Sequence, residues 1–284
     1  METVETNNTI VRKGYEFLKE LCSFNADFNA FGRGKINPIS NRVQYIMNRL
    51  DAHNIPYDVD KFRPIAGVPD YEEGQNAFVN IVVRIEGTNT DATTVFLAHH
   101  DVVNLGTPNF VAENAQDNTA SIANLIDLCV RLSENKPSNN VVIAFVDAEE
   151  IVSPSICGSQ RLAQNILKGI YGNVKYAVNL ELTANGQNYW MSYNDNASVL
   201  AKHIRETHPT THRVRTPYND AFILEKEGVS SVCVGSLTDN NLGQVKTRGY
   251  CSTWAMCHSD NDTFDSQAVE GDMDLFVNWL QTLI

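Results

Sequence analysis

The chain has 284 residues, 43% of them hydrophobic, and its 22 basic and 34 acidic residues give a formal net charge of -12. This hydrophobic fraction is enough for a sizeable core, which excludes a disordered chain. The acidic surplus argues against nucleic acid as a partner, because binding to a phosphate backbone requires a cationic surface.

The first predicted element is an amphipathic helix near residues 8 to 23, which lacks the basic segment and unbroken apolar stretch of a secretory signal. No run reaches transmembrane length, so no membrane partner is expected. The six cysteines include no C-x-x-C pair and several lie in apolar segments, which indicates buried thiols rather than disulfides or a structural zinc site. The expected location is the cytoplasm, or outside the cell if a leader has been removed.

The next segments predict a second helix from Asn41 to His53, a short strand at Tyr57 to Val59 and a longer strand at Phe78 to Ile85. Loops punctuated by glycine and proline lie around residues 31 to 34 and 64 to 74. The turn EGTNTDA then joins the longer strand to Thr94–Ala98, and this spacing predicts a β-hairpin.

From there on, strands alternate with helices. The helices are expected near residues 118–134, 158–168, 197–207 and 275–283, and the strands near 141–146, 176–180 and 231–234. This alternation predicts an α/β fold of three layers, α/β/α, with a mixed central β-sheet. No repeat or linker divides the chain, so residues 1–284 are expected to form one catalytic domain. In such sheets, ligands bind beyond the carboxyl ends of the strands.

Residue types that bind metal ions follow the predicted strands in a fixed order. His99 and Asp101 come directly after the strand TTVFLA and are two residues apart, so their side chains point to the same side of an extended chain. A carboxylate at Asp101 can hold the second ring nitrogen of a metal-bound His99. The alternative is a solvated pair at a turn. His100 faces the other way and is assigned no role.

Asp117 and Asn118 stand where the loop GTPNFVAENAQ enters a predicted helix. Asp-Asn at this position is a common helix N-cap. A carboxylate fixed there can equally bridge two cations, with one oxygen directed to each, so both interpretations remain open for Asp117.

Three glutamates also follow apolar strands. Glu149 and Glu150 end the run VVIAFVDA, and Glu181 follows KYAVNL. Adjacent glutamates are usually a solvated surface pair, but a pair directly after a buried strand places two charges at the edge of the core. Because neighbouring side chains point in different directions, one carboxylate can bind a metal ion while the other acts as a base toward water.

His258, in the polar loop CHSDNDT, completes the set, although an exposed histidine is the simpler interpretation. Two histidines and three carboxylates from five segments can converge over one edge of a sheet. If Asp117 bridges, each of two ions receives three protein ligands and keeps an open position, as catalytic zinc requires. Nitrogen and oxygen ligands without thiolate suit Zn²⁺, and three carboxylates offset most of the charge of two such ions.

In this order of residues the chain resembles the co-catalytic zinc exopeptidases, which include the M28 aminopeptidases and the M20 carboxypeptidases and deacylases, over about residues 75 to 284. The resemblance implies a phosphorylase/hydrolase-like fold and two zinc ions per chain. It implies that one ion is held by His99, Asp117 and Glu181 and the other by Asp117, Glu150 and His258. It also implies that Glu149 is the general acid/base and that Asp101 is the partner of His99.

The M28 branch is the better match. M20 enzymes insert a lid domain before the last ligand, whereas here only 76 residues separate Glu181 from His258. The pattern of these residues predicts one continuous α/β segment without an inserted domain. The segments YNDAF and HSDNDT are similar to M28 patterns around the substrate pocket and the last ligand. The resemblance therefore implies a di-zinc aminopeptidase without a lid domain, acting on peptides.

Several alternatives remain. Glu181 stands where M28 aminopeptidases usually have aspartate, and AHHDVVN is more similar to M20, so an M20-like carboxypeptidase or N-acyl amino-acid deacylase is the main alternative. A glutaminyl-cyclase-like enzyme with one zinc fits less well, because His99 and Asp101 are both present. From another class, the chain could be an inactive metal-binding module. The substrate's side chain and the oligomeric state stay open. Candidate pocket-lining residues are Tyr218, Asp220, Tyr250, Thr253 and Trp254.

Overall fold

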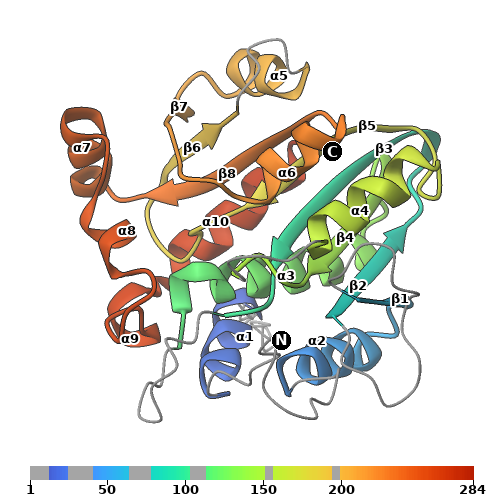
Figure 1. Cartoon of the computed structure of the whole chain (residues 1–284), viewed down its shortest axis with the longest axis horizontal. Helices are drawn as coiled ribbons and strands as arrows, with labels where there is room; N and C mark the ends of the chain where they lie inside the picture. The colour runs from blue at the N-terminus through green and yellow to red at the C-terminus, as the bar shows by residue number, and fades with distance from the viewer. Residues whose placement is uncertain (1–12, 25–40, 64–77, 103–112, 151–155, 194–198) are drawn as a thin grey trace, which may run out of the picture.

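The computed structural model describes residues 13–24, 41–63, 78–102, 113–150, 156–193 and 199–284. Its centre is a mixed eight-stranded sheet with the order β1-β2-β4-β3-β5-β8-β6-β7 (Figure 1). The strands are β1 (Tyr57–Phe62), β2 (Phe78–Ile85), β3 (Asn89–His99), β4 (Asn139–Val146), β5 (Val174–Leu180), β6 (Asn188–Ser192), β7 (His212–Arg213) and β8 (Ser231–Leu237). The central strands β4, β3, β5 and β8 run parallel, whereas β1, β2 and β6 add antiparallel pairs.

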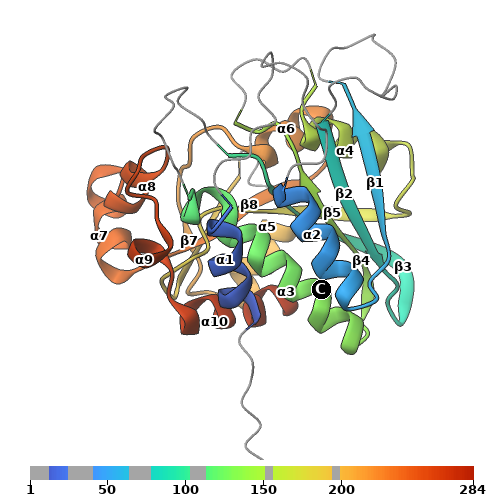
Figure 2. The same ribbon diagram turned by 90° about the horizontal axis from the view of Figure 1, so that it is seen from below.

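Helices cover both faces of this sheet, which confirms the predicted three-layer α/β/α fold. On one face α1, α2, α3 and α10 lie side by side (Figure 2), and on the other face α4 and α6 lie in front of the sheet in the view of Figure 1. The helices are α1 (Lys13–Cys22), α2 (Asn41–Ala52), η1 (Ala115–Thr119, a single π-type turn), α3 (Ala120–Glu134), α4 (Gly158–Leu167), α5 (Val199–Thr207), α6 (Asp220–Glu227), α7 (Asp239–Arg248), α8 (Ser252–Met256), α9 (Phe264–Gln267) and α10 (Glu270–Gln281).

The uniformly apolar run in β4 has a direct structural cause. Val141, Ile143 and Phe145 pack in the core formed with α1, α2, α3 and α10. The alternating residues Val142 and Ala144 pack in the second core, which α4 and α6 close. A strand that is buried on both faces needs apolar residues at every position, as a parallel strand between two helical layers does.

The predicted hairpin between β2 and β3 is wrong, because β4 lies between these two strands and pairs with both. Their connection passes over the start of β4, where the Thr88 amide donates to the Pro137 carbonyl at 2.9 Å. Gly87 fits this crossing, since a Cβ there would lie 2.3 Å from the backbone carbon of Asn139. A short polar turn indicates a change of direction, but it does not show which strand becomes the partner.

The boundaries of most predicted helices and strands agree with the structure within a few residues. Helix α3 begins at Ala120 rather than at Asn118, because the residues before it form the separate turn η1. The loops predicted around residues 31–34 and 64–74 lie outside the described residues. All six cysteines are free thiols, five of them buried, as expected.

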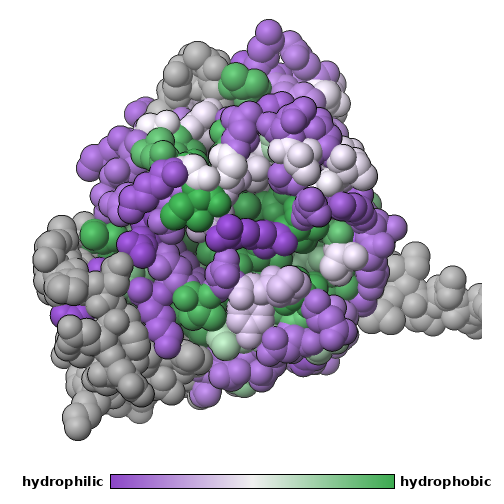
Figure 3. All heavy atoms as spheres, turned by 90° about the vertical axis from the view of Figure 1, so that its right-hand side faces the viewer, coloured by the Kyte–Doolittle hydropathy of each residue, from purple (hydrophilic) through white to green (hydrophobic). Residues whose placement is uncertain are grey.

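None of the described helices is both long and apolar enough to cross a membrane. Figure 3 shows the side of the molecule opposite α7 and α8, where hydrophilic surface surrounds hydrophobic side chains near the middle.

Candidate metal centre

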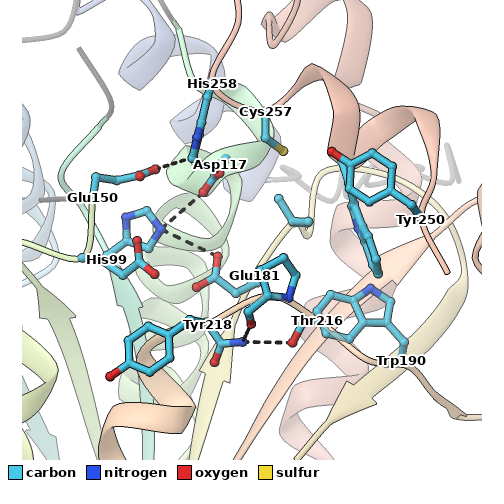
Figure 4. A pocket seen from close by; sticks show the side chains of 15 residues that line it. His99, Asp117, Glu150, Glu181, Trp190, Thr216, Tyr218, Tyr250, Cys257 and His258 are labelled. Atoms are coloured by element: carbon cyan, nitrogen blue, oxygen red, sulfur yellow. Dashed lines mark hydrogen bonds and ion pairs between the residues drawn. The ribbon is translucent and has the colours of Figure 1, made fainter. Parts of the chain in front are cut away.

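The candidate ligands converge because neighbouring parallel strands end at the same edge of the sheet. His99 is the last residue of β3, the pair Glu149 and Glu150 follows β4, and Glu181 directly follows β5. Since β4, β3 and β5 are parallel neighbours, these side chains emerge at one edge, as ligand-binding groups do in open α/β sheets. Figure 4 shows His99, Glu150 and Glu181 around one hollow.

Unusual backbone conformations border this edge. Positive φ angles occur at Asn114 (46°), Ala148 (70°), Leu182 (58°) and His258 (61°), and none of these residues is a glycine. The first three lie within three residues of a candidate ligand, and the fourth is a candidate ligand itself. Non-glycine residues in this region carry a conformational cost that the surrounding structure must offset, and they cluster at functional sites.

Asp117 is presented by the turn η1, and the segment around His258 holds that turn in place. The Asp262 carboxylate accepts hydrogen bonds from the backbone amides of Gln116 at 2.8 Å and Asp117 at 3.1 Å. The peptide bond between Asp117 and Asn118 is cis. The residue that precedes α3 is Thr119, so the N-cap interpretation of Asp117 is wrong. Its side chain faces the two histidines instead.

The two carboxylate oxygens of Asp117 face different imidazoles. Oδ1 lies 3.3 Å from Nε2 of His99, and Oδ2 lies 3.1 Å from Nε2 of His258. Each imidazole nitrogen also faces an outer glutamate: Glu181 Oε2 lies 3.7 Å from His99, and Glu150 Oε1 lies 3.2 Å from His258. The result is two sets of three donor groups that share Asp117.

Glu149 belongs to a third group. One of its carboxylate oxygens lies within 4.8 Å of ligand atoms of His99 and Glu150, and its side chain faces the same hollow. This position allows Glu149 either to reach a water molecule between the two sets of ligands or to serve as a ligand itself.

The predicted partnership of His99 and Asp101 takes a different form from the one expected. Nδ1 of His99 lies 3.1 Å from the backbone carbonyl oxygen of Asp101 and 3.5 Å from its carboxylate. With the proton on Nδ1, the ring donates to that carbonyl and directs the lone pair of Nε2 toward Asp117. The Asp101 carboxylate accepts the backbone amides of Glu149 and Glu150 at 3.2 and 2.9 Å, so it also positions the loop after β4.

Burial shifts the acid–base properties of the cluster. Burial raises the pKa of Glu150 and Glu181 to about 7, and it raises the pKa of Glu149 well above 4.5, with the carboxylates of Asp220, Glu181 and Glu150 adding to the effect. Hydrogen bonds from the two histidines hold the pKa of Asp117 below its usual range despite its burial. Crowded, buried acidic groups of this kind are typical of sites that bind cations or carry out acid–base chemistry.

These residues fit zinc. For tetrahedral Zn²⁺ with ligand bonds of about 2.0–2.1 Å, neighbouring ligand atoms lie roughly 3.3 Å apart. The distances from Asp117 to the two imidazoles match that value. In addition, Glu150 Oε1 is buried and faces Nε2 of His258 at 3.2 Å, a separation that also suits two ligands of one ion.

A cavity of about 290 Å³ opens beside the cluster. Its wall includes Tyr218, Tyr250 and Trp254, as predicted, together with Leu182 and Trp190. The other two candidates do not line it. Asp220 is buried at the start of α6, and Thr253 is buried and accepts a hydrogen bond from Asn241.

Sequence reasoning missed Arg42, which ties helix α2 to the site. Its side chain is only 2% exposed. Nε donates to the backbone carbonyl of His100 at 3.1 Å, and a terminal nitrogen donates to the Thr119 hydroxyl at 2.8 Å. Arg42 thereby joins the segments that carry His99 and Asp117. An arginine in an amphipathic helix gives no signal of such a role. Sequence reasoning also missed the role of Asp262, although its place in the same polar loop as the candidate ligand His258 is a signal that could have indicated it.

Replacing Arg42 with Gln is expected to lower the free energy of unfolding by about 2–3 kcal/mol, because the His100 carbonyl and the Thr119 hydroxyl lose a charged donor inside the protein. Urea denaturation of the purified variant measures this loss. The matched control is Arg248→Gln, which removes a solvent-exposed guanidinium at the end of α7. An equal change in both variants would contradict a structural role for Arg42.

Comparison with known proteins agrees with the fold. The model of peptidase family M28 matches residues 80–273. A leucine aminopeptidase precursor from Bacteroides thetaiotaomicron is 14% identical, with a TM-score of 0.67 and coverage of 96% of this chain and 95% of that one. A glutaminyl cyclase from the same organism, bound to N-acetylhistamine, is 16% identical, with a TM-score of 0.67 and 96% of each chain covered. A Zn-dependent exopeptidase from Parabacteroides distasonis is 14% identical, with a TM-score of 0.67 and 95% of each chain covered. No curated protein matches the chain.

The match to this family model, together with the fold, identifies a zinc-dependent metallopeptidase. The chain belongs to peptidase family M28.

Proposed function

We propose that the protein is a di-zinc aminopeptidase that releases the N-terminal residue of peptides. The observation that carries this proposal is the bridging position of Asp117, whose two oxygens face His99 and His258 separately. Two sets of three ligands with a shared carboxylate are the arrangement that two co-catalytic zinc ions require.

When bound, zinc supplies Lewis acidity that polarises the scissile carbonyl and acidifies water. The protein's own groups do the rest. Glu149 accepts a proton from the attacking water as the new C–O bond forms, and it passes that proton to the leaving amine nitrogen as the C–N bond breaks. The raised pKa of Glu149 suits this exchange. A group that acts first as a base and then as an acid is most effective when its pKa lies near the working pH.

The cavity beside the cluster suits the first residue of a substrate. Leu182, Trp190 and Trp254 provide an apolar wall, which accommodates the first side chain and excludes water. The carboxylates of Glu149 and Glu181, in the same cavity, favour a free α-ammonium group over an acylated one.

A substrate panel on zinc-loaded protein tests this assignment. Amino-acid anilides and dipeptides with a free α-amine should be cleaved at least tenfold faster than their N-acetyl counterparts, since burying an acylated nitrogen among carboxylates forfeits the charge interaction. Preference for the N-acetyl compounds would identify a deacylase or carboxypeptidase. Conversion of an N-terminal glutamine to a ring with loss of ammonia, detected by mass spectrometry, would identify a glutaminyl cyclase. No turnover of any compound would favour a metal-binding module.

Zinc binding is expected to release protons near pH 7. Burial holds the pKa of Glu150 and Glu181 near 7, and hydrogen bonds to Asp117 and Glu150 hold that of His258 near 10. All three groups must be unprotonated to bind zinc, so affinity should fall as the pH decreases below about 10, where His258 gains a proton, and more steeply below about 7, where the glutamates also do. Titration calorimetry in buffers of different ionisation enthalpy counts the protons, and release of none at pH 7 would contradict this ligand set.

A further inference from the structure

A second hollow lies next to the metal centre, and its charge is opposite. This hollow, here called the basic groove, has a volume of about 840 Å³. Its cationic side chains are Arg213 in β7, Arg215 in the following loop and Lys226 in α6. Among the described residues, no carboxylate lines it. Three cations and no described carboxylate around one hollow contrast with the net charge of -12 of the whole chain.

The basic groove adjoins the metal centre. Thr216 and Tyr218 line both hollows. In the view of Figure 4 these two residues lie on the far side of the active-site hollow from His258. The two hollows are therefore neighbours that share the wall formed by Thr216 and Tyr218.

The wall between the two hollows is firmly held. Thr216 donates from its hydroxyl to Ser192 at 2.9 Å, and the Asn219 side-chain amide donates to the Thr216 hydroxyl at 3.0 Å. The Tyr218 ring, 66% exposed, stacks on Phe222 with ring centroids 6.0 Å apart. Such a wall needs little ordering when a substrate binds, so more of the interaction energy remains as affinity.

The cations are also arranged for an anion. The Arg213 guanidinium lies over the ring of Tyr193 at 4.5 Å, and Arg205 donates to the hydroxyl of the same tyrosine. Arg213 therefore contacts the face of the Tyr193 ring. Because this contact does not use the guanidinium N–H groups as donors, they can bind a carboxylate. A guanidinium fork matches a carboxylate with two parallel hydrogen bonds.

Together, the two hollows are complementary to a peptide with a positive charge at one end and a negative charge a short distance along the chain. We propose that the basic groove binds a carboxylate on the leaving portion of the substrate, so that the enzyme prefers short peptides with a free C-terminus or an acidic residue downstream of the cleaved bond. This inference rests on the proposed aminopeptidase function, because the direction of the peptide follows from its free amine at the metal centre.

Three peptides test the proposal and separate the two sources of the carboxylate. They share a first residue taken from the substrate panel and a second residue of glycine. The first ends in Glu with an amidated C-terminus, the second in Gln with a free C-terminus, and the third in Gln with an amidated C-terminus. For the wild-type enzyme, at least one of the first two should exceed the third by about tenfold in kcat/KM, mainly through KM, as expected for charge-assisted hydrogen bonds.

The triple variant R213Q/R215Q/K226Q should reduce that ratio to near one. The control K168Q/K175Q/R248Q removes three exposed cations outside the groove and changes the net charge equally. This control should keep the ratio, which separates the groove from a general charge effect. Equal rates on all three peptides in the wild type, or the same loss in the control, would overturn the proposal.

Failure of the proposed function gives a different result. If no peptide is cleaved, titration calorimetry can still measure anion binding in the basic groove. The probe is glutarate, a dicarboxylate without a bond to hydrolyse. Glutarate should bind the wild-type protein more tightly than its monoamide does, and the triple groove variant should lose this difference. Equal binding of glutarate and its monoamide by the wild type would reject the groove as an anion site.

Discussion

Glu149→Gln is expected to lower kcat by about 10²- to 10⁴-fold while zinc content stays at the wild-type level. Glutamine keeps the size and the polar oxygen of the side chain, but it cannot accept the proton that the attacking water releases. Steady-state kinetics on the best substrate of the panel, together with elemental analysis of the same preparation, measures both quantities.

The comparison variant is Glu206→Gln, which changes an exposed glutamate of α5 and should retain wild-type kinetics. Two outcomes would change the assignment. Loss of zinc along with activity would make Glu149 a ligand, as its proximity to His99 and Glu150 allows. Retained activity would remove it from the reaction.

Asp117→Asn is expected to reduce bound zinc from two ions per chain to fewer than one and to abolish measurable turnover. The amide offers one oxygen and no charge, so it cannot face both imidazoles as the carboxylate does. At least one set is then left with two donors, and the negative charge that offsets the two ions falls by one. Elemental analysis after dialysis measures the content.

The matched control is Asp260→Asn, an exposed carboxylate in the same loop as His258, which should keep both ions. Zinc added before heating should raise the Tm of this control and of the wild type, because a ligand that binds only the folded state stabilises it. The Asp117 variant should show little of this effect. Retention of both ions in Asp117→Asn would rule out the bridging role.

The two substitutions separate functions that activity alone would confuse. One is expected to remove proton transfer and keep the metal, and the other to remove the metal. Arg42 and Asp262 act indirectly, because their hydrogen bonds hold the backbone segments that carry His99 and Asp117. A loss of activity caused by those two residues should therefore come with a measurable loss of stability or zinc affinity.

Much of the fold could be predicted from local patterns. The apolar run of β4 and the amphipathic helix α3 were evident from spacing, because burial on two faces or on one face imposes different periodicities. The partner of each strand could not be read in the same way. The hairpin prediction failed since pairing depends on where the crossover through α3 delivers β4, which lies 40 residues beyond the end of β3 in the chain.

Part of the candidate site could likewise be predicted from local sequence patterns, and part of it could not. Residue types and strand-end positions were sufficient to choose His99, Glu150 and Glu181, because a charged group directly after a buried strand needs a reason to be there. The basic groove had no comparable signal. Arg213, Arg215 and Lys226 give no such signal in the sequence, and only the tertiary structure brings them around one hollow.

By itself the sequence determined the layered α/β architecture, the acidic net charge and the set of side chains that could bind metal ions. These properties follow from composition and from periodicities of a few residues. The tertiary structure decided that Asp117 faces two histidines at once, that Asp101 positions the loop of Glu149 and Glu150, and that an acidic cavity adjoins a basic groove. Such relations depend on distances between segments far apart in the chain, which only the packed sheet and its helices set.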